Sequence, residues 1–304
     1  MEFPPAGKVY FMSYPDSVRL FLGRQEAMDS AEVDKNGAFI LKPSVRMPAV
    51  FSLRCGNMDL AANLLIRPGD KLDFKFSGKD QEAVVDSKGE ASDFNAFLLR
   101  FIRQFYKEPG VKNQYYIASN YMEPPAFEEY TLGRRDAMLD FYKTDDVGTG
   151  KDPLFRDYIH FTIQYEFACD RLMYIWKKRM KGHPVTPDSA YFSFAEPGFI
   201  ENPKAFVTPS YIRFINLYLK ESYESKVERG ELPLVKGLAL IPSVEKYRMA
   251  RSGYHSPVQE ALLYNLILND LDPGGKAGGA ALDSLEKVFR HKYSITEKSV
   301  PLKK

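Results

Sequence analysis

The chain contains little cysteine and histidine, and this scarcity excludes several kinds of site. Its 304 residues include two cysteines, Cys55 and Cys169, and four histidines that stand apart from one another. No Cys-x-x-Cys pair exists, and no two histidines have the three- or four-residue spacing of a metal site on a helix. The sequence therefore predicts no metal and no dithiol centre, and both thiols are expected to be structural.

An excess of charge of one sign is also missing. Lys and Arg total 42 and Asp and Glu total 40, which gives a formal net charge of +2. Because the charges are interspersed, the positive field that nucleic-acid binding requires is absent, and no nucleic-acid partner is predicted. The most basic run, residues 177–181, closes a predicted helix, where cations complement the helix dipole.

Long apolar runs do not occur. No segment of 18 or more apolar residues is present, so the sequence predicts no transmembrane helix. Residues 1–7 have neither the basic nor the apolar region of a signal peptide. Two alternatives follow: the protein is cytoplasmic, or Met1 replaces a removed export signal.

Sequence motifs for nucleotide binding and for nucleophilic catalysis are absent as well. No Gly-x-Gly-x-x-Gly or Walker pattern follows a predicted strand, and the nearest approach to a nucleophile elbow, residues 251–255, has no strand before it. No cofactor and no catalytic residue are therefore predicted.

The first 88 residues have the pattern of an antiparallel β-sandwich. Val18, Leu20 and Leu22 share one face of a predicted strand, as in strands with one buried face. Asn36-Gly37 and Pro68-Gly69-Asp70 are typical of tight hairpin turns. The predicted strands cover residues 8–13, 17–22, 27–33, 38–43, 49–54, 60–67, 71–77 and 82–86.

Beyond Gly89 the apolar residues recur at helical spacing, and Ser92 or Asp93 is a plausible N-cap for the first helix. Asp152-Pro153 opens the longest helix, and Gly182 marks its end. The predicted helices cover residues 94–105, 127–144, 153–180, 209–228, 234–251, 257–271 and 280–293. The expected fold is α+β, with a β-sandwich in residues 1–88 and an all-α bundle in residues 89–304.

Two kinds of side chain are candidates for function. Glu166 and Asp170 lie four residues apart on the longest helix and could raise each other's pKa, as the carboxyl pair of a hydrolase requires. The alternative is that they are solvated or paired with neighbours such as Arg171.

Aromatic side chains form the second group, because tyrosine and phenylalanine in or near loops can stack on sugars or anchor peptides. The alternative is that they fill helix-packing interfaces. The candidate ligand-binding residues are Tyr115, Tyr116, Tyr121, Tyr191 and Phe192.

Three short segments resemble the N-terminal region of the TlpA/ResA-like thiol-disulfide oxidoreductases of Gram-negative bacteria. They are the Asp34-x-x-Gly37-x-Phe39 turn, the Pro68-Gly69-Asp70 turn and the join at residues 89–95, and residues 210–219 and 247–263 are similar to the family's helical segment. The resemblance implies a β-sandwich of unknown function that leads into helices and then into a thioredoxin domain. That domain carries the family's Trp-Cys-x-x-Cys motif, which this chain lacks.

The resemblance leads us to expect a non-catalytic accessory or interaction module of an extracytoplasmic protein. Its partner would be a thioredoxin-like domain, either C-terminal to Lys304 or on a separate chain. We expect it in the periplasm or lipid-anchored at the outer membrane, with its export signal absent from this chain. The alternative is a stand-alone extracytoplasmic protein that binds a glycan or a peptide through loop aromatics.

Overall fold

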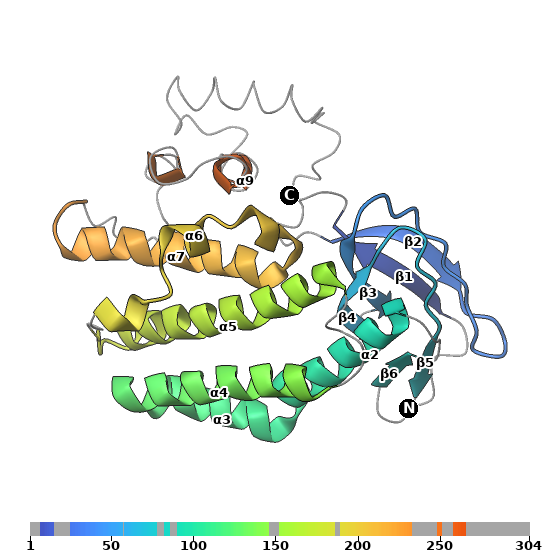
Figure 1. Cartoon of the computed structure of the whole chain (residues 1–304), viewed down its shortest axis with the longest axis horizontal. Helices are drawn as coiled ribbons and strands as arrows, with labels where there is room; N and C mark the ends of the chain where they lie inside the picture. Colours follow the sequence, from blue (N-terminus) through green and yellow to red (C-terminus); the bar gives the residue numbers. More distant parts are fainter. Residues whose placement is uncertain are drawn as a thin grey trace. The chain divides into compact units, whose positions relative to one another are not determined.

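The computed structural model describes residues 7–14, 25–56, 58–77, 82–85, 90–145, 152–185, 189–232, 248–250 and 258–265. Within these residues the protein is a mixed α+β structure in which strands come first and helices follow (Figure 1). The α+β class predicted from the sequence is confirmed. The pattern of contacts between residues divides the chain into two compact units, Met1–Tyr218 and Leu219–Lys304.

The strands form one antiparallel sheet and one separate ribbon. The sheet has the order β2-β1-β3-β4, and the ribbon pairs β5 with β6. The strands are β1 (Lys8–Ser13), β2 (Glu26–Glu32), β3 (Ala49–Cys55), β4 (Met58–Ile66), β5 (Phe74–Ser77) and β6 (Glu82–Val85).

Burial follows the position of each strand in the sheet. β1 alternates between buried residues such as Val9 and Phe11 and more exposed ones, whereas most of β3 is buried. β3 and β4 form the predicted hairpin, in which Gly56 has φ 56°. This left-handed backbone suits glycine, which has no Cβ to clash.

Two of the predicted hairpins are wrong. Residues 38–43 form no strand. The Asp34 carboxylate accepts hydrogen bonds from the backbone N–H of Asn36 and of Ala38, both at 2.8 Å, and Asp29 accepts one from Lys42 N. Side chains therefore take up the backbone donors that a strand would offer to a neighbouring strand. These N–H groups, Ala38 N first, also lower the pKa of Asp34.

The second wrong hairpin is the one at Pro68-Gly69-Asp70. Gly69 has φ 87°, so the tight turn is real, but among the described strands β5 pairs with β6 and not with β4. The turn ends β4, and Phe74 of β5 then packs edge-to-face on Phe51 of the sheet with ring centroids 6.3 Å apart.

The helices of the first unit follow the ribbon. They are α2 (Glu90–Ile102), α3 (Pro109–Tyr121), α4 (Pro124–Thr144), α5 (Pro153–Met180), α6 (Pro197–Ile200) and the start of α7 (Pro209–Glu228). Short helical turns of other types are η1 (Arg103–Lys107), η2 (Ser189–Phe192) and η3 (Pro203–Val207). In the second unit the structure describes the rest of α7 and α9 (Val258–Asn265).

The start of α5 is as predicted, because Asp152 Oδ1 accepts from the N–H groups of Leu154 and Phe155 at 2.8 and 3.2 Å. Ser92 and Asp93 are not N-caps, since α2 already includes Glu90. α3 is not among the helices predicted from the sequence. The predicted strand at residues 17–22 and the predicted helix at residues 280–293 lie outside the described residues, and of the predicted helix at residues 234–251 only residues 248–250 are described.

One hydrophobic core joins the sheet to the helices. It contains buried residues of β1, β3 and β4 together with residues of α2, α4 and α5. Phe94 of α2 stacks on Phe155 of α5 with ring centroids 4.3 Å apart, and Phe11 of β1 stacks on Phe51 of β3 at 4.9 Å. Phe97, Phe101 and Phe141 extend the aromatic packing into α4.

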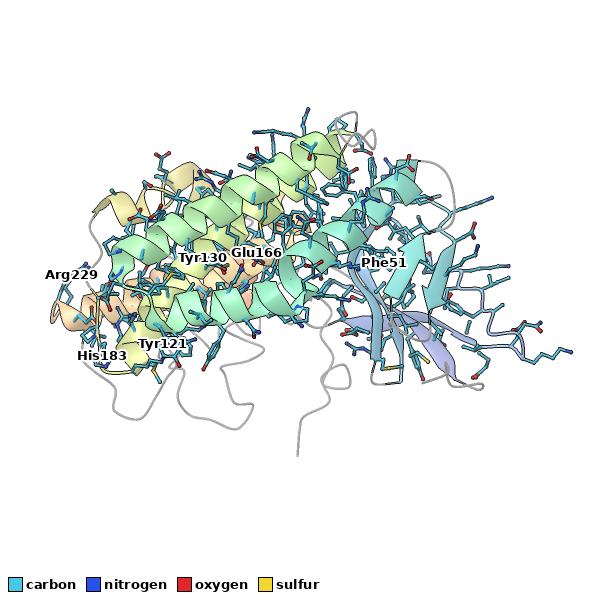
Figure 2. All side chains as sticks on the ribbon, turned by 90° about the horizontal axis from the view of Figure 1, so that it is seen from below. Phe51, Tyr121, Tyr130, Glu166, His183 and Arg229 are labelled. Carbon is cyan, nitrogen blue, oxygen red and sulfur yellow. The ribbon has the colours of Figure 1, made fainter. Side chains whose placement is uncertain are left out.

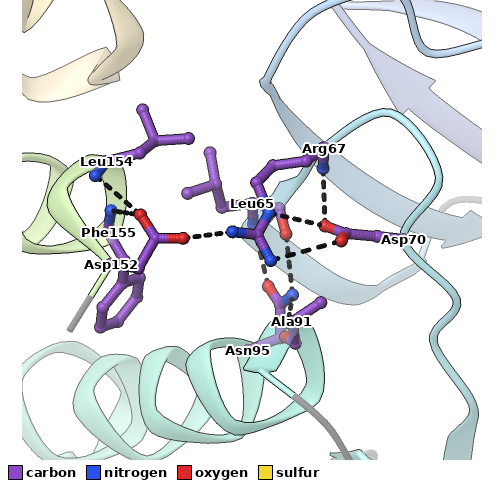
Figure 3. A network of polar contacts seen from close by, with 8 residues as sticks. All are labelled: Leu65, Arg67, Asp70, Ala91, Asn95, Asp152, Leu154 and Phe155. Carbon is purple, nitrogen blue, oxygen red and sulfur yellow. Dashed lines mark hydrogen bonds and ion pairs between the residues drawn. The ribbon is translucent and has the colours of Figure 1, made fainter. Parts of the chain in front are cut away.

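A polar network connects the end of β4 to α2 and α5 (Figure 3). The Asn95 side chain accepts from Leu65 N at 2.9 Å and donates to Leu65 O at 2.7 Å. The Arg67 guanidinium donates to Asp152 and lies 3.4 Å from Asp70, whose carboxylate also accepts from Arg67 N. Asp152 therefore caps α5 and binds the sheet at the same time.

No helix among the described residues is both long enough and apolar enough to span a lipid bilayer.

Replacing Asn95 by Ala should destabilise the first unit, because it leaves the N–H and C=O of Leu65 buried without partners. We expect a loss of about 2–4 kcal/mol in the free energy of unfolding, measured by urea denaturation. Asn113→Ala, at an exposed position of α3, is the matched control and should change this free energy by no more than about 0.5 kcal/mol. Equal effects of the two substitutions would contradict the assignment.

Candidate functional site

A cluster of charged and phenolic side chains lies inside the helical part of the first unit. Its centre is Asp170 of α5, which is 5% exposed. Arg134 of α4 donates through Nη1 to Asp170 at 2.8 Å and through Nη2 to the carbonyl of Phe105 at 3.1 Å. The Tyr115 hydroxyl of α3 also donates to Asp170. Asp170 thus holds three helices together.

Aromatic rings surround the same arginine. The Arg134 guanidinium lies 5.1 Å from the ring of Tyr106 and 5.9 Å from the ring of Tyr115. Lys177 of α5 approaches the ring of Tyr115 at 5.2 Å and donates to Ser119 Oγ at 2.9 Å. These contacts fix the inner side of α3 against α5.

Glu166 lies one turn before Asp170 and has different partners. It accepts from Ser210 Oγ at 2.7 Å and from Arg213 Nη1 at 3.1 Å, both from the start of α7. Figure 2 shows Glu166, a residue of α5, among the helices of the first unit. The two carboxylates on α5 therefore point to partners on different helices.

Burial dominates the ionisation of this cluster. Burial raises the pKa of Asp170 to about 6, Arg134 opposes this shift, and the charge of Glu166 adds to it. Burial also raises the pKa of Tyr106 and Tyr115 well above the ordinary range, so both phenols stay neutral. Burial lowers the pKa of Lys177.

This arrangement is typical of a structural network more than of a hydrolase. Each carboxylate accepts a hydrogen bond from an arginine, and neither pairs with Arg171, which the sequence analysis had considered. Arg171 instead donates to Glu128 and lies over the ring of Tyr191 at 4.0 Å. An acid with a pKa near 6 can exchange a proton near neutral pH, but Asp170 is buried among protein partners.

The five candidate aromatics, expected in or near loops, belong to helical segments of the described chain. Tyr191 and Phe192 belong to η2, and Tyr191 is buried with its hydroxyl donating to Arg171 O at 3.0 Å. Tyr115, Tyr116 and Tyr121 belong to α3. The structure does not bring the five together: Tyr115 faces Asp170, whereas Tyr116 and Tyr121 face outward.

The outward side of α3 is a second candidate site. Tyr116, Ile117 and Tyr121 are 58%, 51% and 66% exposed, and the two tyrosine rings are 6.3 Å apart in an edge-to-face arrangement. Lys181, just beyond α5, donates to Asn120 Oδ1 at 2.8 Å and lies 5.4 Å from the ring of Tyr121. We call Tyr116, Ile117, Asn120, Tyr121, Met180 and Lys181 the α3 face.

Cysteine and histidine add no further centre. Cys55 in β3 and Cys169 in α5 are buried free thiols, and burial raises the pKa of Cys169 well above its ordinary value. Cys169 Sγ lies 3.7 Å from Ser210 O. Within the described ranges, His, Cys, Asp and Glu form no group of three or more that could hold a metal ion.

Sequence reasoning missed the arginines of the cluster, Arg134 and Arg213, because their partners are 36 and 47 residues away along the chain. It also missed Lys181 as part of a surface. The sequence does contain a signal for a helix at residues 109–121. Pro109 fits the first turn of a helix, Tyr116 lies four residues before Asn120, and Ile117 lies four residues before Tyr121.

Comparisons with family models, with curated proteins and with solved structures found no match for this chain. The arguments about function therefore depend on the residues themselves.

The pKa of Asp170 predicts a pH dependence of stability. Because burial raises this pKa from 3.8 to about 6 on folding, the folded state binds the proton more tightly, and stability decreases as pH rises through this window. We expect the difference in unfolding free energy between wild type and Asp170→Asn to fall by about 2 kcal/mol between pH 4 and pH 7.

Urea denaturation of both proteins at each pH measures this difference and cancels the contributions of the other acids. A difference that stays constant would show that Asp170 titrates normally in the folded protein, and one that rises with pH would show that folding lowers its pKa.

Proposed function

We propose that this chain is a non-catalytic interaction module of an extracytoplasmic thiol-disulfide oxidoreductase-like protein, and that it acts through the α3 face. The observation that carries the proposal is the exposure of Tyr116, Ile117 and Tyr121 together on one side of a single helix. Aromatic side chains supply large contact areas at little cost in conformational entropy, and exposed groups of them mark interaction sites.

The attachment of α3 supports this role. Arg134, Asp170 and Tyr115 hold its inner side, and Lys177 and Lys181 of the α5 end donate to Ser119 and Asn120. A surface held in this way loses little freedom when a partner binds.

The sequence resemblance to the TlpA/ResA-like family supports the cellular context. It rests on Asp34, Gly37 and Phe39 and on the Pro68-Gly69-Asp70 turn. We also propose a β-sandwich in residues 1–88, a helical bundle in residues 89–304, and a location in the periplasm or at the outer membrane. The proposed partner is a thioredoxin-like domain, in the same polypeptide or separate.

A stand-alone glycan- or peptide-binding protein is the second candidate. Its supporting observation is that the α3 face places the phenols of Tyr116 and Tyr121 beside the amide of Asn120 and the ammonium of Lys181. Stacking surfaces with adjacent hydrogen-bonding groups suit either kind of ligand.

Titration calorimetry with a TlpA-type thioredoxin domain, an oligosaccharide panel and a peptide panel tests both candidates. We expect at least one of them to bind, and the Tyr116→Ala/Tyr121→Ala variant to weaken that binding by about tenfold or more. Ile40→Ala is the matched control, because Ile40 is 76% exposed but lies beside the sheet. If nothing binds, or if the double variant binds as wild type does, the α3 face is not the functional surface.

A further inference from the structure

We infer that the α3 face is a docking surface for an acidic peptide segment that carries aliphatic or aromatic side chains, supplied by a protein partner. This inference rests on the proposed function and names the chemistry of the ligand.

The apolar part of the surface comes from two helices. The large hydrophobic side chains that are well exposed fall into two groups, one beside the sheet and one on the α3 face. The second group is Tyr116, Ile117, Tyr121 and Met180, with exposed fractions of 58%, 51%, 66% and 64%. Residues of a helix that are spaced by four lie on one side, so Ile117 and Tyr121 present their side chains together.

Lys181 connects the C-terminal ends of α3 and α5 into one surface. Its ammonium group bridges Asn120 of α3 and the ring of Tyr121, and Met180 precedes it at the end of α5. Figure 2, in which Tyr121 is labelled, shows α3 on the side of the helical layer that faces the viewer. The opposite side of α3, with Ala118 and Ser119, is buried.

The charge of the surroundings selects an acidic ligand. Among the cations of residues 108–123 and 176–183, Lys112 and Lys181 are exposed, whereas Lys178 is buried and Lys177 donates to Ser119 on the inner side of α3. The acids of the same residues are Glu108 and Glu123. Glu123 is 3.7 Å from Lys178. Lys112 is exposed one turn before Tyr116, so cations flank the apolar centre on both sides. Opposite charges at the rim of an interface steer association and exclude partners of the same sign.

Aliphatic side chains favour a peptide over a glycan. Sugars stack on aromatic rings and form hydrogen bonds, and Ile117 and Met180 offer neither. These two side chains instead match the apolar residues of a polypeptide, and an apolar centre of Tyr and Met with a polar rim is typical of protein interfaces.

Phage display of short random peptides tests the inference, with wild-type protein as bait and the Tyr116→Ala/Tyr121→Ala variant for counter-selection. We expect the enriched peptides to be acidic and to contain Leu, Phe or Tyr. A synthetic copy of an enriched peptide should bind about tenfold more weakly to Lys181→Glu and to Lys112→Glu, and more weakly at high ionic strength. Ile40→Ala should bind it as wild type does.

Circular dichroism melting of each variant controls for folding, and Lys112 serves as the second site should Lys181→Glu not fold. Enrichment of neutral or basic peptides, or unchanged binding to both charge-reversal variants, would overturn the inference. A glycan array is run in parallel. Glycan binding that needs Tyr116 and Tyr121, without acidic peptides, would overturn the inference and support the second candidate function. No ligand in either screen would overturn the inference, and the titration with a thioredoxin domain would then decide the proposed function separately.

Discussion

The need to satisfy the buried backbone polar groups at the end of β4 is the constraint on which the rest of the first unit depends. The last residues of this strand are covered by α2 and α5, so their backbone polar groups have no access to water and need partners within the protein. Asn95 satisfies Leu65, and Arg67 binds the carboxylates at the turn and at the start of α5. The aromatic stack of Phe94 on Phe155 lies beside these polar groups, with the Arg67 guanidinium 5.5 Å from the Phe94 ring.

The two sides of α3 have different roles: the inner side contributes to stability, and the outer side is the proposed recognition surface. The inner side of α3 contributes Tyr115 to a buried cluster in which each carboxylate has an arginine partner. The outer side presents Tyr116 and Tyr121. Substitutions on the two sides therefore have different consequences, since the inner side holds α3 in place and the outer side is available for contact.

The sequence predicts the regular elements well where the signal is local. The cap at Asp152 and the stop after Met180 define α5, and the strand predicted at residues 8–13 coincides with β1. The α3 helix was missed because its outer side is aromatic and aliphatic, so the usual alternation of apolar and polar sides is weak there. The turns at Gly37 and Gly69 are predicted correctly, but a turn does not determine which strands pair on either side of it. After Gly37, the carboxylates of Asp29 and Asp34 accept the backbone hydrogen bonds that a partner strand would otherwise accept.

Asp152 has a consequence for the order in which this fold forms. Its carboxylate caps α5 through contacts two and three residues away, and the same group meets Arg67 across 85 residues of chain. The first contacts form within a single helical turn, whereas the last requires closure of a long loop, which is slow. The first turn of α5 can therefore form before the helix packs against the sheet. The ion pair between Asp152 and Arg67 forms only when they pack together. Amide exchange near Leu154 would then report on the sheet as well as on the helix.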